Sequence, residues 1–240
     1  SYSTLFAKGT KEKPIKIYSS DQTANGFSVL QASKKSILTY VTFSNLNTLS
    51  YDGWRLSGAV NFYESNVDLL HCSFLENHCE DALNIIRSHF EVKYAFFNKI
   101  YADAFDSDFC TGNLVDSKFL EVNNDAIDFS TSQINITNCD IKNILDKGIS
   151  GGEDSKLNVS NCTIENANIG VASKDLSEVK LTNVFINNAK YGLVALQKKA
   201  EYGSATLETE KLKLENCETK LLIEKGSSVI LNGKRILGDK

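Results

Sequence analysis

The chain has 240 residues, of which 42% are hydrophobic and 23% charged, and its formal net charge is −4 at pH 7. This apolar content can build a core, which excludes a disordered chain, and the acidic balance argues against a nucleic-acid-binding protein. No apolar run reaches the length of a membrane-spanning helix, about 18 residues, so we expect no membrane insertion. The chain contains no Met, so we expect it to begin downstream of its natural start, with any signal peptide already removed.

Residues 1–56 show the weakest pattern in the chain. Within them the segment GFSVLQASKKSILTYVTFSNL, residues 26–46, has short stretches rich in apolar and β-branched residues, which favour strands. We expect an entry segment here, followed by one or two irregular strand-built units.

Residues 57–203 repeat with a period of about 22 residues. The repeats contain the segments DALNIIRS, DAFDSDFC, DAIDFSTS, KGISGGED, IGVASKDL and YGLVALQK, whose first residues are Asp81, Asp103, Asp125, Lys147, Ile169 and Tyr191. Apolar and polar residues alternate in the segments that follow, such as INITNCDI and LNVSNCTI, which indicates strands. A unit this short cannot bury its own apolar face, so successive units must stack. The sequence therefore predicts an all-β, single-stranded parallel β-helix of about ten rungs.

Stacking places equivalent residues of successive rungs in columns, with about 4.8 Å between neighbours. Asn143, Asn166 and Asn188 recur at one phase of the repeat and predict an amide ladder at a turn. Cys139 and Cys162 fall in one inward column. We expect these cysteines to be reduced and to pack as small hydrophobic side chains.

Residues 204–240 lose the regular spacing. The terminal segment SSVILNGKRIL contains the pair Asn232-Gly233, which favours a hairpin with a two-residue turn. Solenoids need such an end to cover the open edge of the core. We therefore predict one domain made of irregular rungs (1–56), regular rungs (57–203) and a C-terminal cap (204–240).

The outward positions of the repeat collect acidic residues. In each first strand the third residue is apolar and points inward, so its neighbours point outward. Three neighbouring outward columns then hold Asp103, Asp106, Asp108, Asn124, Asp125 and Asp128. Two carboxylates about 4.8 Å apart repel by about 1 kcal/mol in water, and by about 3 to 4 kcal/mol at an effective dielectric constant of about 20. Some of these groups must therefore take up protons, pair with Lys147 or bind a cation.

Clustered Asp and Asn oxygens are hard ligands, which suit calcium better than zinc. The sequence predicts calcium as a cofactor, bound by Asp103, Asn124, Asp125 and Asp128. The alternative is a solvated acidic face that Lys147 neutralises.

The rungs DAFDSDFC, NNDAIDFS, DKGISGGEDS, NIGVASKDLS and LQKKAEYG resemble right-handed, pectate-lyase-like β-helix modules that accompany spore-coat-H-type kinases in bacterial surface proteins. The resemblance covers most of residues 57–203. It implies right-handed winding and a secreted or cell-surface location, as a monomeric module within a larger multidomain chain.

A looser similarity links the acidic residues to the calcium pocket of family 9 pectate lyases, which are also β-helices. Asp103 in ADAF matches the first ligand of that family, and Asn124, Asp125 and Asp128 in NNDAID match its ligand-rich motif one rung later, with one Asp replaced by Asn. The base of that family is a Lys one further rung on, where this chain has Ser150. The similarity thus implies a metal site more strongly than lyase activity.

Two functions from different classes follow. The first is a non-catalytic, calcium-stabilised extracellular module that binds or displays carbohydrate. The second is a calcium-dependent lyase of acidic, uronate-containing polysaccharide, in which Lys174 or Lys147 abstracts the C5 proton. We favour the first function, because Lys147 stacks over Asp125 and because we expect Lys174 to lie about 10 Å from Asp128. Polysaccharide is the expected partner in both.

Substrate contacts are predicted at Asp106, Asp108, Ser150 and Glu153. A glycosidase is a further variant, because Asp106 and Asp128 stack at about 5 Å, the separation of retaining enzymes. Stacking gives that distance throughout a β-helix, so the distance alone does not discriminate. A row of aromatic side chains beside the acidic residues would favour an enzyme, but Phe109 and Phe129 both fall on inward positions.

Overall fold

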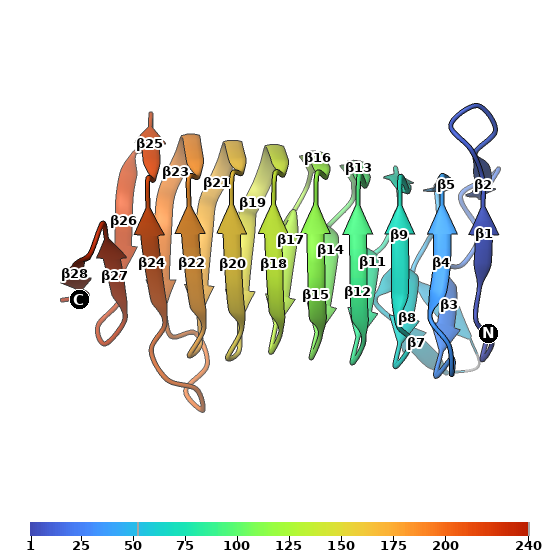
Figure 1. The fold of residues 1–240 in the computed structure, drawn as a ribbon, viewed down its shortest axis with the longest axis horizontal. Coiled ribbons are helices and arrows are strands. Elements are labelled where there is room, and N and C mark those ends of the chain that lie inside the picture. Colours follow the sequence, from blue (N-terminus) through green and yellow to red (C-terminus); the bar gives the residue numbers. More distant parts are fainter. Residues whose placement is uncertain (52, 240) are drawn as a thin grey trace.

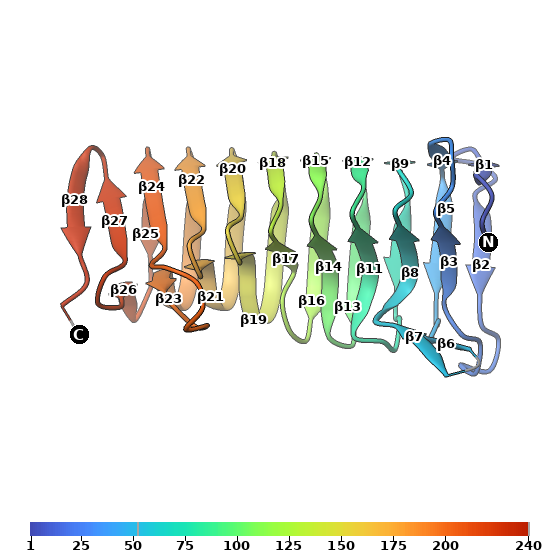
Figure 2. The same ribbon diagram turned by 90° about the horizontal axis from the view of Figure 1, so that it is seen from below.

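The computed structural model describes residues 1–51 and 53–239, and all regular structure within these residues is β-strand. The strands stack side by side into an elongated solenoid, with the N-terminus at one end and the C-terminus at the other (Figures 1 and 2). Nowhere in the described residues is there a helix long and apolar enough to cross a membrane.

One side of the solenoid is an eleven-stranded sheet, here called face A. Its strands are β1 (Phe6–Lys8), β4 (Ser36–Thr39), β9 (Val67–Leu70), β12 (His89–Lys93), β15 (Thr111–Val115), β18 (Gln133–Thr137), β20 (Lys156–Ser160), β22 (Glu178–Thr182), β24 (Thr206–Glu210), β27 (Ser228–Leu231) and β28 (Lys234–Leu237). All except β28 run parallel, one per rung, which confirms the predicted parallel β-helix of about ten rungs.

The other sheet bends around the remaining two sides, faces B and C. Face B contains β2 (Ile15–Tyr18), β5 (Val41–Ser44), β10 (Ser73–Leu75), β13 (Phe96–Ile100), β16 (Lys118–Val122) and β25 (Lys213–Glu215). Face C contains β3 (Phe27–Leu30), β8 (Gly58–Tyr63), β11 (Asp81–Ile86), β14 (Asp103–Asp108), β17 (Ile127–Ser130) and β26 (Thr219–Ile223). Three long strands run through both faces and join them: β19 (Asp140–Gly152), β21 (Thr163–Lys174) and β23 (Phe185–Leu196).

Two hairpins depart from the repeat. The strands β6 (Leu49–Tyr51) and β7 (Trp54–Leu56) form an antiparallel pair before β8. At the other end, β27 and β28 pair antiparallel, and φ is 49° at Asn232 and 82° at Gly233. Both turn residues therefore have the left-handed backbone of a type I′ turn, as the Asn-Gly pair predicted.

The core is a continuous set of columns inside the solenoid. Leu83, Phe105 and Ile127 are fully buried, which confirms their predicted inward direction. On face B, the aromatic rings of Phe43, Phe74, Phe97 and Phe119 stack with centroid distances of 5.4, 4.6 and 4.6 Å. Each such aromatic pair contributes about 0.5–1.5 kcal/mol beyond the burial of its apolar area.

The turn between faces B and C explains the recurrence of Asn in the sequence. Asn143, Asn166 and Asn188 have left-handed φ values of 59°, 58° and 55°, a backbone that Asn tolerates better than most residues. Asn166 Nδ2 donates to Asn143 Oδ1 at 2.8 Å, and Asn188 Nδ2 donates to Asn166 Oδ1 at 2.8 Å. The predicted amide ladder is therefore confirmed.

The cysteines are all free, and only Cys217 is partly exposed. Cys139 and Cys162 lie in one inward column, where Cys139 N donates to Cys162 Sγ at 3.4 Å. They pack as buried side chains, as predicted.

Candidate functional site

The predicted acidic residues lie on the outer side of face C. Strands β11, β14 and β17 pair in register, so that Asp81 lies beside Asp103, Asp106 beside Asp128, and Asp108 beside Ser130. We call the following set the acidic row: Asp81, Asn84, Asp103, Asp106, Asp108, Asp125, Asp128 and Ser150. The prediction omitted Asp81 and Asn84, although Asp81 begins one of the 22-residue repeats.

At the start of these strands, the carboxylates of the acidic row connect neighbouring rungs. Asp103 Oδ1 accepts hydrogen bonds from Asp125 N at 2.7 Å and from Asn124 Nδ2 at 2.6 Å. Asp125 Oδ1 in turn accepts from Lys147 N at 3.0 Å. The contact recurs because the register places the N–H of each following rung beside the preceding carboxylate. These side chains therefore have a structural role in addition to any ligand contact.

Lys147 neutralises Asp125. Its Nζ lies 3.1 Å from both carboxylate oxygens of the buried Asp125 and 2.5 Å from Asp146 Oδ2. Burial alone would lower the pKa of Lys147, but Asp125 and Asp146 raise it above its ordinary value. The lysine is therefore a cation at neutral pH and is a poor candidate for a base.

Lys174 lies closer to the acidic row than its position in the sequence suggested. Its Nζ is 3.5 Å from Asp128 Oδ1, whereas we expected a separation of about 10 Å. The backbones are two rungs apart, but the lysine side chain extends back across the intervening rung, where Gly152 has no side chain. A Cβ at Gly152 would lie 2.8 Å from Ser130 Oγ and 3.5 Å from Lys174 Cε. The prediction was wrong because it neglected the length of the lysine side chain.

Four acids of the row have no such cation. In the described residues no Lys or Arg forms an ion pair with Asp81, Asp103, Asp106 or Asp108. Burial raises the pKa of Asp81 to about 7 and that of Asp103 to about 6. The half-buried Asp106 has a pKa well above its ordinary value because of burial and the neighbouring Asp81 and Asp108. The row thus combines carboxyl groups with raised pKa values and carboxylates that are paired to lysines.

The outward column of the row ends in polar atoms that the protein leaves without hydrogen bonds. These atoms are Asn84 Oδ1, Asp128 Oδ1 and Ser150 Oγ, and the side chains of Asn84 and Ser150 are 2% and 0% exposed. Asp128 Oδ1 faces the Lys174 ammonium only at the ion-pair distance of 3.5 Å. Leaving one such atom unsatisfied costs about 1–3 kcal/mol. These three atoms are inaccessible to solvent, so a ligand would reach them only after neighbouring side chains move.

The residues predicted to bind calcium lie on neighbouring rungs, but their polar atoms are engaged. Asn124 directs its Nδ2 at Asp103, and Lys147 Nζ binds both oxygens of Asp125. Within residues 1–51 and 53–239, no three His, Cys, Asp or Glu side chains are placed to hold one metal ion. As they lie, these side chains do not fit calcium, so calcium binding stays a prediction that requires Lys147 to leave Asp125.

The loop after β23 closes one end of the row. Lys199 Nζ lies 2.5 Å from Glu153 Oε1, one of the predicted substrate contacts. The backbone N–H groups of Lys198 and Lys199 donate to Asp175 Oδ1 at 2.6 and 2.7 Å. Sequence reasoning missed Lys199, because the loop stands outside the 22-residue repeat and nothing in its composition indicates a partner.

Phe109 is exposed, contrary to its predicted inward direction. Its φ of 56° places it in a turn, where the alternation of a strand no longer holds, and 52% of its surface is accessible. The guanidinium of Arg87 lies 4.9 Å from the centre of its ring. Phe129 is buried as predicted.

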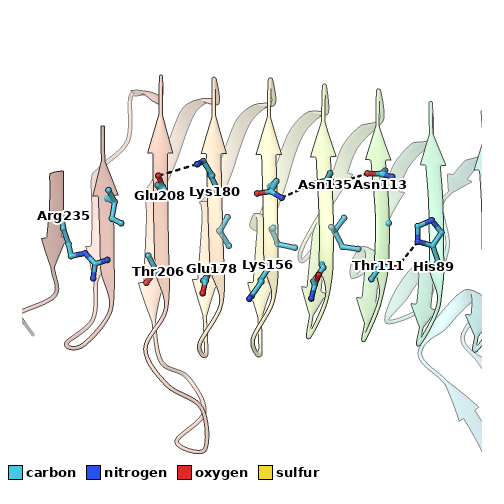
Figure 3. A pocket seen from close by; sticks show the side chains of 17 residues that line it. His89, Thr111, Asn113, Asn135, Lys156, Glu178, Lys180, Thr206, Glu208 and Arg235 are labelled. Carbon is cyan, nitrogen blue, oxygen red and sulfur yellow. Dashed lines mark hydrogen bonds and ion pairs between the residues drawn. The ribbon is translucent and has the colours of Figure 1, made fainter. Parts of the chain in front are cut away.

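A second feature lies on face A, which the sequence did not single out. A groove of about 800 Å³ follows the outer side of face A, and polar side chains from successive strands line it (Figure 3). The sequence carries no signal for it, because outward polar residues are the default on a solvent-exposed sheet.

Comparison with solved structures finds similarity to carbohydrate-active enzymes at low identity. An alginate lyase from Paenibacillus sp. strain FPU-7 is 10% identical, with 92% of this chain and 85% of the lyase covered and a TM-score of 0.42. A pectate lyase from Paenibacillus sp. 0602 is 12% identical, with 95% and 66% covered and a TM-score of 0.44. The catalytic domain of a family 87 α-1,3-glucanase is 12% identical, with 95% and 61% covered and a TM-score of 0.46. This chain spans less than two thirds of that glucanase structure, and none of these similarities transfers an activity to it.

A comparison with curated protein sequences finds no match. The sequence does match the family described as "right handed beta helix region", over residues 13–207 and again over residues 100–238. The resemblance to modules that accompany spore-coat-H-type kinases stays a prediction. The two matched ranges together span most of the chain, and the parallel rungs agree with them, so the chain belongs to the right-handed β-helix family.

Proposed function

We propose that the acidic row binds the hydroxyl groups of a carbohydrate, in an extracellular β-helix module of a larger bacterial surface protein. The observation that carries the proposal is the group of partly exposed carboxyl groups at Asp106, Asp108 and Asp128, which the parallel register brings together on the outer side of face C. Sugar hydroxyls both donate and accept hydrogen bonds, so they can pair with a carboxylate and with a protonated carboxyl group. An apolar ligand would take these groups out of water without replacing their hydrogen bonds.

The charge of the row favours an uncharged sugar over a uronate. Asp81, Asp103 and Asp106 have raised pKa values, and a further carboxylate would add to the repulsion that raises them. A protonated Asp106 can donate a hydrogen bond as well as accept one. The uronate-containing substrate of our second sequence-based hypothesis would therefore need a bridging cation.

Catalysis is the second candidate function. Asp106 has a raised pKa and lies in register with Asp128, whose carboxylate pairs with Lys174. Glycoside hydrolysis requires a carboxylic acid beside a carboxylate. The same contact places Lys174 where a lyase base could act, but the ion pair must open before the lysine can accept a proton. Ser150, at the position of the family 9 base, cannot take a proton from carbon unaided.

The test is calorimetric titration with hexasaccharides of neutral sugars (gluco-, manno- and xylo-) and of galacturonate. Asp106→Ala and Asp128→Asn should each weaken binding of a neutral hexasaccharide by about tenfold, because the first removes the donor and acceptor of a carboxyl group and the second removes a charge-assisted hydrogen bond. Asp140→Asn on face B is the matched control, because Asp140 pairs with Lys142 far along the rung from the row. The proposal fails if no hexasaccharide binds, or if the two row variants bind like the control. If the wild type cuts a hexasaccharide into shorter products and the row variants do not, catalysis becomes the favoured function.

A further inference from the structure

The groove on face A runs along the solenoid axis, from β12 to β28 (Figure 3). Two outward columns line most of it. The first column holds His89, Thr111, Gln133, Lys156, Glu178 and Thr206, and the second holds Asn113, Asn135, Asn158, Lys180 and Glu208. The parallel register puts one member of each column on every rung, so polar groups recur about every 4.8 Å along the groove.

The second column contains an amide ladder. Asn135 Nδ2 donates to Asn113 Oδ1 at 2.9 Å, and Asn158 Nδ2 donates to Asn135 Oδ1 at 3.0 Å. Asn113 Nδ2 continues the ladder to Glu91 Oε1. Each internal amide uses one N–H and one lone pair in the ladder, which leaves a second N–H and a second lone pair for a ligand. The ladder fixes the orientation of these groups, so they are organised before a ligand arrives.

The groove carries charges of both signs, with one more cation than anions among its Lys, Arg and Glu residues. Lys156, Lys180 and Arg235 line it together with Glu178 and Glu208, and Lys180 Nζ lies 3.6 Å from Glu208 Oε1. A surface with interspersed charges of both signs does not attract a polyanion as a basic stripe does. Nucleic acid and polyuronate are therefore poor candidates.

A protein segment fits the groove no better. The apolar residues of its floor, Ile134, Leu157 and Val179, direct their side chains into the core and are each 1% exposed. The groove thus lacks the apolar pockets that anchor an amphipathic helix. The inner strands of face A pair on both sides with neighbouring rungs, so they offer no free backbone edge for an added strand.

We propose that this groove binds an uncharged polysaccharide chain that lies along the solenoid axis, across the strands. The rung spacing is close to the length of one sugar ring in an extended chain, so successive rings can meet equivalent amides. Hydroxyls donate to the free lone pairs of Asn113 and Asn135 and accept from their free N–H groups. This site lies on a different face from the acidic row and does not depend on it.

The matched pair of variants is Asn135→Ala and Asn166→Ala. Both residues occupy the middle of an amide ladder and make two side-chain hydrogen bonds with neighbouring rungs, but Asn166 lies at the turn between faces B and C. Asn166→Ala should lose at least as much thermal stability as Asn135→Ala, because Asn166 also has a left-handed φ of 58° that Ala tolerates less well. Binding that survives in Asn166→Ala but not in Asn135→Ala therefore reports the groove and not the loss of stability. Gln133→Arg fills the groove with a longer side chain and leaves the ladder intact, which covers the case that Asn135→Ala folds poorly.

The experiment is affinity electrophoresis in native gels that contain hydroxyethyl cellulose, glucomannan, dextran or polygalacturonate. We expect a neutral polysaccharide to retard the wild type and Asn166→Ala equally, and retardation to fall about tenfold in Asn135→Ala and in Gln133→Arg. The inference is overturned if no neutral polysaccharide retards the wild type, if Asn135→Ala and Gln133→Arg migrate like the wild type, or if polygalacturonate alone retards it. Loss of binding only in Asp106→Ala and Asp128→Asn would reject the groove and leave the proposal for the acidic row standing.

Discussion

Lys174 pairs with Asp128 across an intervening rung, and Gly152 provides the path. The ammonium nitrogen lies 3.5 Å from Asp128 Oδ1 although the two backbones belong to strands β21 and β17, with β19 between them. The side chain of Lys174 is 10% exposed and that of Asp128 is 25% exposed, so the pair is partly shielded from bulk water. The acidic row thus takes one of its counter-charges from a rung that lies outside it.

Removing this ammonium should destabilise the fold. Lys174→Met keeps the apolar stem but leaves Asp128 without its cation, and we expect a loss of about 2 kcal/mol in the free energy of unfolding. Urea unfolding at neutral pH measures it. Lys142→Met is the control, because Lys142 lies in an exposed ion pair and should change stability by less than about 1 kcal/mol. Equal effects of the two substitutions would show that Lys174 does not neutralise a buried charge.

Gly152→Ala tests how closely the side chains pack at this glycine. The added methyl group would lie 2.8 Å from Ser130 Oγ, so the Ser130 side chain must shift, whereas Lys174 Cε at 3.5 Å stays at an ordinary contact distance. We expect a loss of about 1–3 kcal/mol from overpacking. In the Ser130→Ala background the close contact is absent, and the loss should be smaller. Additive losses in the double variant would contradict this contact as the source of the strain.

The acidic row should make the protein more stable in weak acid than in weak base. Burial raises the pKa of Asp81 to about 7 and that of Asp103 to about 6, above the values in the unfolded chain. A raised folded-state pKa means that the folded protein binds the proton more tightly, so this contribution is complete below about pH 4 and is lost as the pH rises through 6 to 7.

Urea unfolding at pH 5 and pH 8 measures this dependence. Asp103→Asn should flatten the profile, because the amide does not titrate, whereas Asp140→Asn on face B should leave its slope unchanged. A profile that rises from pH 5 to pH 8 in the wild type would contradict the raised pKa values.

Calcium, if it binds, should compete with Lys147. The lysine ammonium lies 3.1 Å from both oxygens of Asp125, so calcium should raise the melting temperature of Lys147→Ala more than that of the wild type. Thermal unfolding with micromolar to millimolar calcium measures this, with magnesium as the control ion. If calcium has no effect on either protein, the predicted site at Asp103, Asn124, Asp125 and Asp128 is removed.

The repeat made most of the fold predictable. The 22-residue spacing fixes which residues stack, and alternation fixes which side of a strand they occupy, so the inward direction of Leu83, Phe105 and Ile127 followed from counting. The same counting brought Asp106 and Asp128 together. Counting fails where the backbone leaves the strand, as at Phe109, whose left-handed φ turns its ring outward.

Counting also fails for contacts that depend on side-chain length or on loops. Lys174 reaches Asp128 because its side chain is long and because Gly152, on the rung between them, has no side chain. The period of the repeat specifies neither property. Lys199 meets Glu153 from a loop of irregular length. The groove on face A requires the curvature of the sheet, which the alternation of polar and apolar residues does not encode.

The parallel register has a consequence for how such a chain can change in length. Apart from longer contacts such as the Lys174–Asp128 pair, each rung packs mainly on the rungs beside it, and Asn135 meets the same kind of amide above and below. Duplication or deletion of one whole 22-residue unit outside residues 125–174 would therefore preserve most contacts except at the junction. A gene that lengthens by such units would extend the groove on face A by one repeat at a time, while the end pieces stay the same.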